Sequence, residues 1–222
     1  IYGDARASTS LCCSPEFSTM VKLVCIAVLR HEGKGEKPLM LAQATDMSSF
    51  SFFTRGKAKE FIIFGSRTTC QRTPPGERVT VNCGYKDYVA HSMVRSDRLA
   101  GVVVTDEEYP KDMAYQLLYL VLRDVNAKLG DKWKKVKGES KVSPPFMEKY
   151  LKDYQEPAKM DKMGQVLKEV GELKLQLKDN LVLLLDRGEK LDDIVEKAED
   201  LSDLSKEFYI QSKKHNQCCK SW

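Results

Sequence analysis

Two adjacent cysteines near the C-terminus are the residues best suited to covalent chemistry in this sequence. Cys218 and Cys219 stand fifth and fourth from the end, shortly after Lys213 and Lys214. A cysteine fourth from the end is where a prenyl group attaches, and a neighbouring cysteine can carry a palmitoyl group as a second anchor. We therefore predict palmitoylation of Cys218 and prenylation of Cys219, which together would hold the chain durably on a membrane. Unmodified thiols are the alternative, because residues 220–222 (KSW) lack the aliphatic residue usual in a prenylation tail.

A single arginine inside an apolar stripe is the second candidate. Alternating steps of three and four residues on either side of Arg187 meet mostly apolar side chains. Steps that average 3.5 residues are the repeat of a helix that supercoils with partner helices. We predict such a helix over residues 163–215, about 80 Å long at 1.5 Å per residue. Its layers are Met163, Val166, Val170, Leu173, Leu177, Asn180, Leu184, Arg187, Leu191, Ile194, Ala198, Leu201, Ser205, Phe208, Ser212 and His215.

The charge of Arg187 constrains what the stripe can pair with. A guanidinium has five donors and keeps its proton, so burying it without acceptors would be strongly destabilising. A satisfied polar layer fixes the register of a bundle, because slipped alignments leave it unpaired. Arg187, Asn180 and Ser205 would weaken the core of a homodimer. A structural homo-oligomeric coiled coil, or a tethering or adaptor protein, is nevertheless the alternative function class.

Composition and the remaining polar residues argue against several other classes. The net charge of +4 is too mild to indicate nucleic-acid binding. No P-loop, dinucleotide-binding, zinc-protease or esterase motif is present. The seven cysteines are odd in number and lack a CxxC pair, which favours free thiols over a disulfide framework or a zinc site. His91 is interpreted as a packing residue. We predict no enzyme activity, no metal and no nucleic-acid partner.

Apolar runs and turn signals predict an α+β domain before the stripe. Strands are expected over 21–29, 38–44, 78–83, 85–95 and 99–105, where apolar and β-branched residues lie between turn signals. Helices are expected after Asp46, from Pro110 to Gly130 and over 146–154, where apolar residues recur at helical spacing. The order β-β-α-β-β-β-α-α gives a five-stranded antiparallel sheet with helices packed on its faces.

Four phenylalanines stand out in the first predicted helix. They are Phe50, Phe53, Phe61 and Phe64. Packing against the sheet is one explanation for such an aromatic face. The alternative is that part of this face forms a groove for another segment or a lipid chain.

Breaks in the pattern divide the chain into five parts. We expect an extension over 1–19 with Met20 as the natural start, a globular domain over 20–155 and a linker over 156–162 that contains Pro157. The coiled-coil motif covers 163–215, and the lipidation tail covers 216–222. No stretch approaches the ~20 apolar residues of a membrane-spanning helix. We therefore expect a cytosolic chain that reaches membranes through added lipids.

The stripe, the dicysteine end and the preceding domain together resemble one family. Residues 183–195 (LLLDRGEKLDDIV) are similar to the segment around the central arginine of R-SNAREs. Residues 46–53 (DMSSFSFF), 94–104 (VRSDRLAGVVV) and 108–110 (EYP) are similar to a longin domain, which has a profilin-like fold. A longin domain, an R-SNARE motif and a C-terminal dicysteine without a spanning helix are the arrangement of the lipid-anchored longin SNAREs.

This resemblance implies a function and a set of partners. Arg187 would be the zero layer of a parallel four-helix bundle with three Q-SNARE helices (Qa, Qb and Qc), whose glutamines would accept its hydrogen bonds. Assembly would drive fusion of vesicle and target membranes in the secretory and endosomal pathway. The longin domain would regulate the motif by autoinhibition in a closed state. The implied locations are the cytosol and the cytoplasmic face of Golgi, ER-derived vesicle and endosomal membranes, with prenyl and palmitoyl groups in place of a cofactor.

Overall fold

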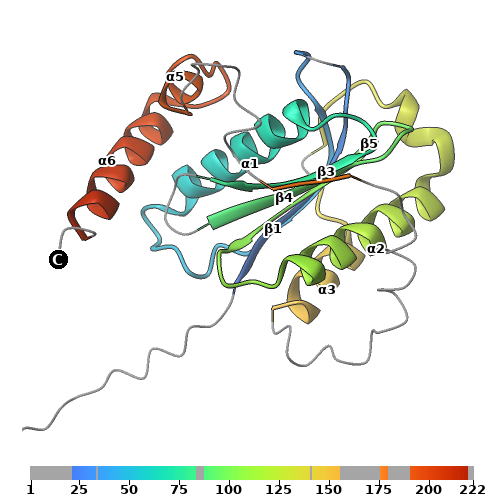
Figure 1. The fold of residues 1–222 in the computed structure, drawn as a ribbon, viewed down its shortest axis with the longest axis horizontal. Coiled ribbons are helices and arrows are strands. Elements are labelled where there is room, and N and C mark those ends of the chain that lie inside the picture. Colours follow the sequence, from blue (N-terminus) through green and yellow to red (C-terminus); the bar gives the residue numbers. More distant parts are fainter. Residues whose placement is uncertain are drawn as a thin grey trace, which may run out of the picture.

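The computed structural model describes residues 22–33, 35–83, 88–140, 142–155, 176–179 and 191–219, with side chains described up to 214 but not within 176–179. Figure 1 shows a sheet between two layers of helices, with the C-terminal helices beside the first helix. The elements are β1 (Leu23–Arg30), β2 (Leu39–Thr45), α1 (Arg55–Arg72), β3 (Glu77–Asn82), β4 (Tyr88–Val94), β5 (Leu99–Asp106), α2 (Lys111–Leu129), the 3-10 helix η1 (Gly130–Lys135), α3 (Pro145–Asp153), β6 (Gln176–Asp179), α5 (Leu191–Glu196) and α6 (Asp203–Cys219).

The first five strands form the predicted antiparallel sheet. The strand order is β2-β1-β5-β4-β3-β6, and all neighbouring strands among β1 to β5 pair antiparallel. The predicted order of strands and helices is confirmed, and so is the α+β class. The first helix begins later than expected, at Arg55, because residues 47–54 form turns instead.

Each face of the sheet carries its own hydrophobic core. Strand side chains alternate between faces, so one set packs under α1 and the other under α2, η1 and α3. The α2 side is sealed by Trp133 and Tyr154, which are each 1% exposed. The α1 side includes side chains from α5 and α6 as well, so the C-terminal segment completes this core.

His91 lies inside the sheet and is fully engaged there. It is 1% exposed, with Nδ1 3.0 Å from the hydroxyl of Thr80 and Nε2 3.2 Å from that of Thr105. The Thr80 hydroxyl also lies 2.8 Å from the hydroxyl of Tyr115 on α2. Because a buried polar group is costly unless it is hydrogen-bonded, this network explains a histidine in a strand. The interpretation of His91 as a packing residue is confirmed.

The expectation of one continuous helix over 163–215 needs correction. Residues 176–179 form β6, which pairs in parallel with β3, and a turn over 197–202 separates α5 from α6. A single long amphipathic helix would leave its apolar stripe in water. The break between α5 and α6 allows both helices to pack apolar side chains against the α1 core. This burial offsets the loss of helical hydrogen bonds at the break. Only the C-terminal parts of the predicted helix are present as helices, in α5 and α6.

Among the described residues, no helix is both long enough and apolar enough to cross a membrane.

Gly101 on β5 supplies a stability test for the fold. A Cβ at this position would lie 2.8 Å from Cδ2 of Leu118 and 3.3 Å from Cγ of Leu122, so only glycine lets α2 sit this close to the sheet. We predict that Gly101→Ala lowers the free energy of unfolding by about 1–3 kcal/mol through overpacking. Urea denaturation measures this change. Gly56→Ala is the control, because nothing lies within 4 Å of its Cβ position, and it should leave stability unchanged or slightly raised.

Candidate functional site

The candidate functional site is the interface where α5 and α6 lie on α1. Helices α1 and α6 run antiparallel, since Arg67 meets Asp200 near the start of the C-terminal segment and Phe61 meets Tyr209 further along. The rings of Phe61 and Tyr209 are stacked with centroids 5.1 Å apart. Tyr209 is 3% exposed. Its hydroxyl donates to Asp192 of α5 at 2.9 Å, which ties the two C-terminal helices together.

Apolar residues of α5 and α6 fill the space over α1. Val195 and Leu201 are only 2% and 5% exposed, and both belong to the hydrophobic core between α1 and the sheet. Leu191, Ile194, Ala198 and Phe208 are partly buried and pack against the same cluster. At ~25 cal/mol per Å² of apolar surface, the burial of these side chains is the main source of docking free energy.

A carboxylate of α1 binds the residues at the start of α6. Glu60 accepts hydrogen bonds from the backbone N–H of Ser202 at 2.6 Å and from the hydroxyls of Ser202 and Ser205 at 2.8 and 2.6 Å. Burial alone would raise the pKa of Glu60, but the bonds from Ser205 and Ser202 outweigh it and hold the pKa below its usual value. The negative charge also lies at the positive end of the α6 dipole. The hydroxyl of Ser202 accepts from the backbone N–H of Ser205 at 3.3 Å and so caps α6, and Glu60 holds this capping residue in place from another element.

Ion pairs fasten the turn between α5 and α6. Asp200 lies 3.2 Å from Arg67 of α1 and 2.7 Å from Lys37, and Arg67 also pairs with Glu139 at 2.9 Å. Burial raises the pKa of Asp200, whereas the hydrogen bond and charge of Lys37 and the charge of Arg67 lower it by more. Partly exposed pairs of this kind contribute little each. Their main effect is to fix the register of the docked segment.

An apolar cavity opens beside this interface. It lies between α1, the sheet and α5, and its lining includes Phe61, Phe64, Val81, Tyr88, Leu191 and Ile194. Almost all of the lining surface is carbon, so the cavity suits an apolar chain and offers few partners to a polar ligand.

The four phenylalanines proposed as a groove divide into three groups. Phe61 and Phe64 line the cavity. Phe50 is 4% exposed and packs on Tyr88 within the core, with ring centroids 6.0 Å apart. Phe53 is 87% exposed and lines nothing, because it belongs to the turns before α1 and not to its inner face. The inclusion of Phe53 in the groove is therefore wrong.

The proposed layer residues are only partly described. Layers from Met163 to Leu173, together with Asn180, Leu184 and Arg187, lie outside the described residues. Leu177 falls in β6, and His215, Cys218 and Cys219 fall in the last turns of α6, where the backbone alone is described. The described layers from Leu191 to Phe208 all lie on the α1 core, with Leu201 5% and Ser205 0% exposed. Ser212 is half-buried, and its hydroxyl donates to the carbonyl of Phe208.

Three interface residues were missed from the sequence. Val195 and Tyr209 each follow a layer residue and are not layer positions themselves, yet both are buried against α1. Glu60 was missed because its partners are about 145 residues away in the sequence. Ser202, three residues before Ser205 at the start of a helix, was the one available signal, since serine is a preferred capping residue.

The buried thiols do not form a reactive centre. Cys25 and Cys70 are each 0% exposed. Burial raises the pKa of Cys25 to about 12 and also raises that of Cys70. Because the thiolate is the nucleophile, neither residue is suited to covalent catalysis at neutral pH.

Comparison with known proteins agrees with this two-part architecture. Residues 47–160 match the family model of the longin domain, described as a regulated-SNARE-like domain, and residues 162–222 match that of synaptobrevin. The chain is 37% identical over 199 residues to the VAMP-like protein YKT61 of Arabidopsis thaliana, covering 90% of this chain and 98% of that protein. It is 41% identical over 203 residues to the synaptobrevin homolog YKT6 of Yarrowia lipolytica, with the same coverage. It is 37% identical over 187 residues to the synaptobrevin homolog YKT6 of Saccharomyces cerevisiae, covering 83% of this chain and 92% of that protein.

The folded domain before residue 156, the motif after it and these relatives all lead to one assignment. The chain belongs to the family of longin-domain R-SNAREs, the synaptobrevin homologues that include YKT6.

Proposed function

We propose that this R-SNARE alternates between a closed state, in which the longin domain holds the C-terminal half of the motif, and an open state that assembles with three Q-SNARE helices. One observation carries the proposal. The described layers from Leu191 to Phe208, which a four-helix bundle would bury, already lie on the core under α1. The same face cannot contact α1 and three partner helices at once, so docking and assembly exclude each other.

Two buried residues distinguish the closed state from the bundle. Val195 and Tyr209 pack against the longin domain but do not occupy layer positions. In a bundle with the 3-4 register they would sit beside the core instead of within it. Loss of either side chain should therefore weaken docking more than assembly.

Energetics favour assembly once partners are present. Burial of about fifteen layers at ~25 cal/mol/Å² gives tens of kcal/mol before the cost of ordering the chain is subtracted. Within the described residues, the docked segment places on the α1 core only the layers from Leu191 to Phe208, fewer than the bundle would bury. The closed state is thus a holding state that partner helices can displace.

The direction of assembly follows from the position of the cysteines. We propose that Cys218 carries a palmitoyl group and Cys219 a prenyl group, at the C-terminal end of α6. A parallel bundle that zips toward this end would draw the anchoring membrane toward the membrane of the partners. At rest, the cavity lined by Phe61 and Phe64 is suited to shelter an apolar chain such as the prenyl group. The proposed sites of action are the cytosol and the cytoplasmic face of Golgi, ER-derived vesicle and endosomal membranes.

Tyr209→Ala tests the closed state. Removal of the buried ring should cost docking about 2–4 kcal/mol, by analogy with aromatic truncations in protein cores. Assembly with soluble Q-SNARE helices should then be at least about tenfold faster, because more of the chain is open. Stopped-flow fluorescence measures the rate. The matched control is Ile210→Ala, since Ile210 is the next residue and is 50% exposed.

A chain without residues 1–155 gives the upper limit of this rate. If Tyr209→Ala and the truncated chain both assemble at the rate of the intact protein, the longin domain does not inhibit the motif.

Arg187→Leu tests the register. The substitution removes the buried charge, so a bundle should still form, but its alignment should be less restricted because slipped registers no longer bury an unpaired guanidinium. Crosslinking of single-cysteine partner helices reports the alignment, and competition among non-cognate helices reports specificity. Leu184→Ile, an apolar change in the neighbouring layer, is the control. Wild-type register and partner choice in Arg187→Leu would contradict the role of the arginine.

The mass of the C-terminal peptide tests lipidation. Peptide from cells should be heavier than the unmodified sequence by one prenyl and one palmitoyl group. Cys219→Ser should remove the first addition, and Cys218→Ser should remove the second alone. A peptide of unmodified mass would show that both thiols are free.

A further inference from the structure

We propose that the longin domain carries its own membrane-contact site, the aromatic tip, which consists of Phe52, Phe53 and the cations Arg55, Lys57 and Lys59. Its ligand is the surface of a bilayer that contains anionic lipids. This site acts independently of the C-terminal lipids and of the release of α6, so it goes beyond the function proposed above.

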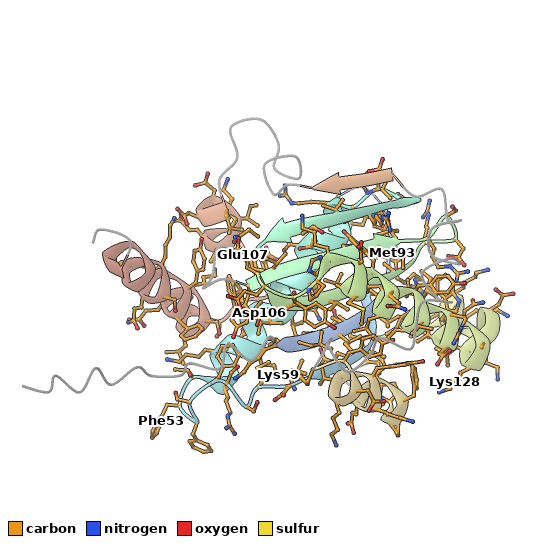
Figure 2. The ribbon with its side chains drawn as sticks, turned by 60° about the horizontal axis from the view of Figure 1, so that its bottom comes forward. Phe53, Lys59, Met93, Asp106, Glu107 and Lys128 are labelled. Carbon is orange, nitrogen blue, oxygen red and sulfur yellow. The ribbon has the colours of Figure 1, made fainter. Side chains whose placement is uncertain are left out.

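Exposure of the two rings is the first observation. Phe52 is 81% and Phe53 87% exposed, far more than any other phenylalanine described. They are adjacent, with ring centroids 5.7 Å apart in an edge-to-face arrangement. In Figure 2, Phe53 lies at the margin of the molecule and points away from it. Paired exposed aromatic rings are typical of sites that bind an apolar phase.

The tip is held in one conformation by its own hydrogen bonds. The carbonyl of Ser51 accepts from the backbone N–H groups of Thr54 and Arg55, both at 3.0 Å. The hydroxyls of Ser51 and Thr54 lie 2.9 Å apart, and Nε of Arg55 donates to the carbonyl of Phe50 at 3.0 Å. Phe50 itself is buried. The two rings are therefore presented by an ordered turn, so insertion would not require the turn to be ordered first.

The charge of the tip indicates which kind of membrane surface it binds. Arg55, Lys57 and Lys59 occupy the first turns of α1, and the first turn contains no acidic residue. Cations at a helix N-terminus oppose the helix dipole, so helix stability does not explain this choice. Arg55 and Lys59 are exposed and Lys57 is half-buried. The nearest acid along the helix, Glu60, is occupied by Ser202 and Ser205 of α6. Apolar rings beside basic side chains that form no ion pair within the described part of the chain match an anionic bilayer, where each cation near the surface adds about 1 kcal/mol.

The tip also lies at the end of the molecule where the lipids would be attached. Helices α1 and α6 are antiparallel, with Phe61 opposite Tyr209. At 1.5 Å per residue, the start of α1 lies about 9 Å before Phe61, and the end of α6 lies about 15 Å beyond Tyr209. The backbone of Cys219 therefore reaches the end of the molecule that carries the aromatic tip. One membrane could contact both, with the tip providing the first and weaker attachment.

Vesicle binding by the full chain made in bacteria, without lipid groups, tests the proposal. The wild-type protein should bind vesicles of phosphatidylcholine with about 30% phosphatidylserine, and the double variant Phe52→Ser/Phe53→Ser should bind at least about tenfold more weakly. The matched control is Leu129→Ser/Val142→Ser, which removes two apolar side chains that are 41% and 63% exposed elsewhere and should bind as wild type. Equal binding by wild type and the Phe52/Phe53 variant would overturn the proposal and leave the rings to a protein partner.

A charge variant separates electrostatic attraction from folding. Arg55→Gln/Lys57→Gln/Lys59→Gln should lower the affinity about fivefold per cation, yet leave thermal stability unchanged or raised because the opposing charges are removed. Unchanged affinity would contradict the choice of an anionic surface.

A third measurement reports directly how deeply the aromatic tip enters the bilayer. Tryptophan emission of Phe53→Trp should be quenched by vesicles with brominated acyl chains, whereas Ile210→Trp should not be quenched. Because both variants contain the same native tryptophans, the difference between them isolates the introduced residue. Absence of quenching in Phe53→Trp would show that the tip does not enter the bilayer.

Discussion

The need to bury one apolar face governs this molecule. Exposure of the apolar layer side chains between Leu191 and Phe208 to water is unfavourable. In this structure they are buried against the core that α1 forms with the sheet. Docking forces the motif to break between α5 and α6 and extends the sheet by β6. In the proposed bundle, partner helices would bury more of the same apolar face. In the regulation proposed above, two surfaces compete for one set of side chains.

Helix α1 links the parts of this competition. It packs on the sheet, stacks Phe61 on Tyr209 of α6, and holds the residues at the start of α6 through Glu60. Its first turn carries the cations beside Phe52 and Phe53. Apolar burial supplies most of the docking free energy, while the ion pairs and the contacts of Glu60 fix the position of the docked segment.

The docking contacts of Glu60 and Asp200 depend on pH. Because the pKa values of both carboxyl groups are lowered in the docked state, these contacts are fully present above the ordinary carboxyl pKa range and weaken as the pH falls through it.

The longin fold was readable from the sequence because its signals are local. Alternating and β-branched runs marked five strands, and Gly130 marked the end of α2. The heptad stripe, in contrast, predicted a continuous helix because it reports affinity for partners that the isolated chain lacks. Phe53 was assigned to the groove because helical periodicity cannot show that the helix begins only at Arg55. Glu60 and the off-register Tyr209 depend on contacts between distant segments, which no local pattern encodes.

The parallel pairing of β6 with β3 has a consequence for the open chain. While β6 is in place, β3 is paired along one side with β4 over Arg78–Asn82 and along the other with β6 over Glu77–Thr80. When β6 leaves, β3 becomes an edge strand whose free N–H and C=O groups can template association with other chains. In the proposed cycle, opening would thus create an aggregation hazard at the same time as it exposes the motif. Docking of the motif until partner helices are present would keep this edge covered.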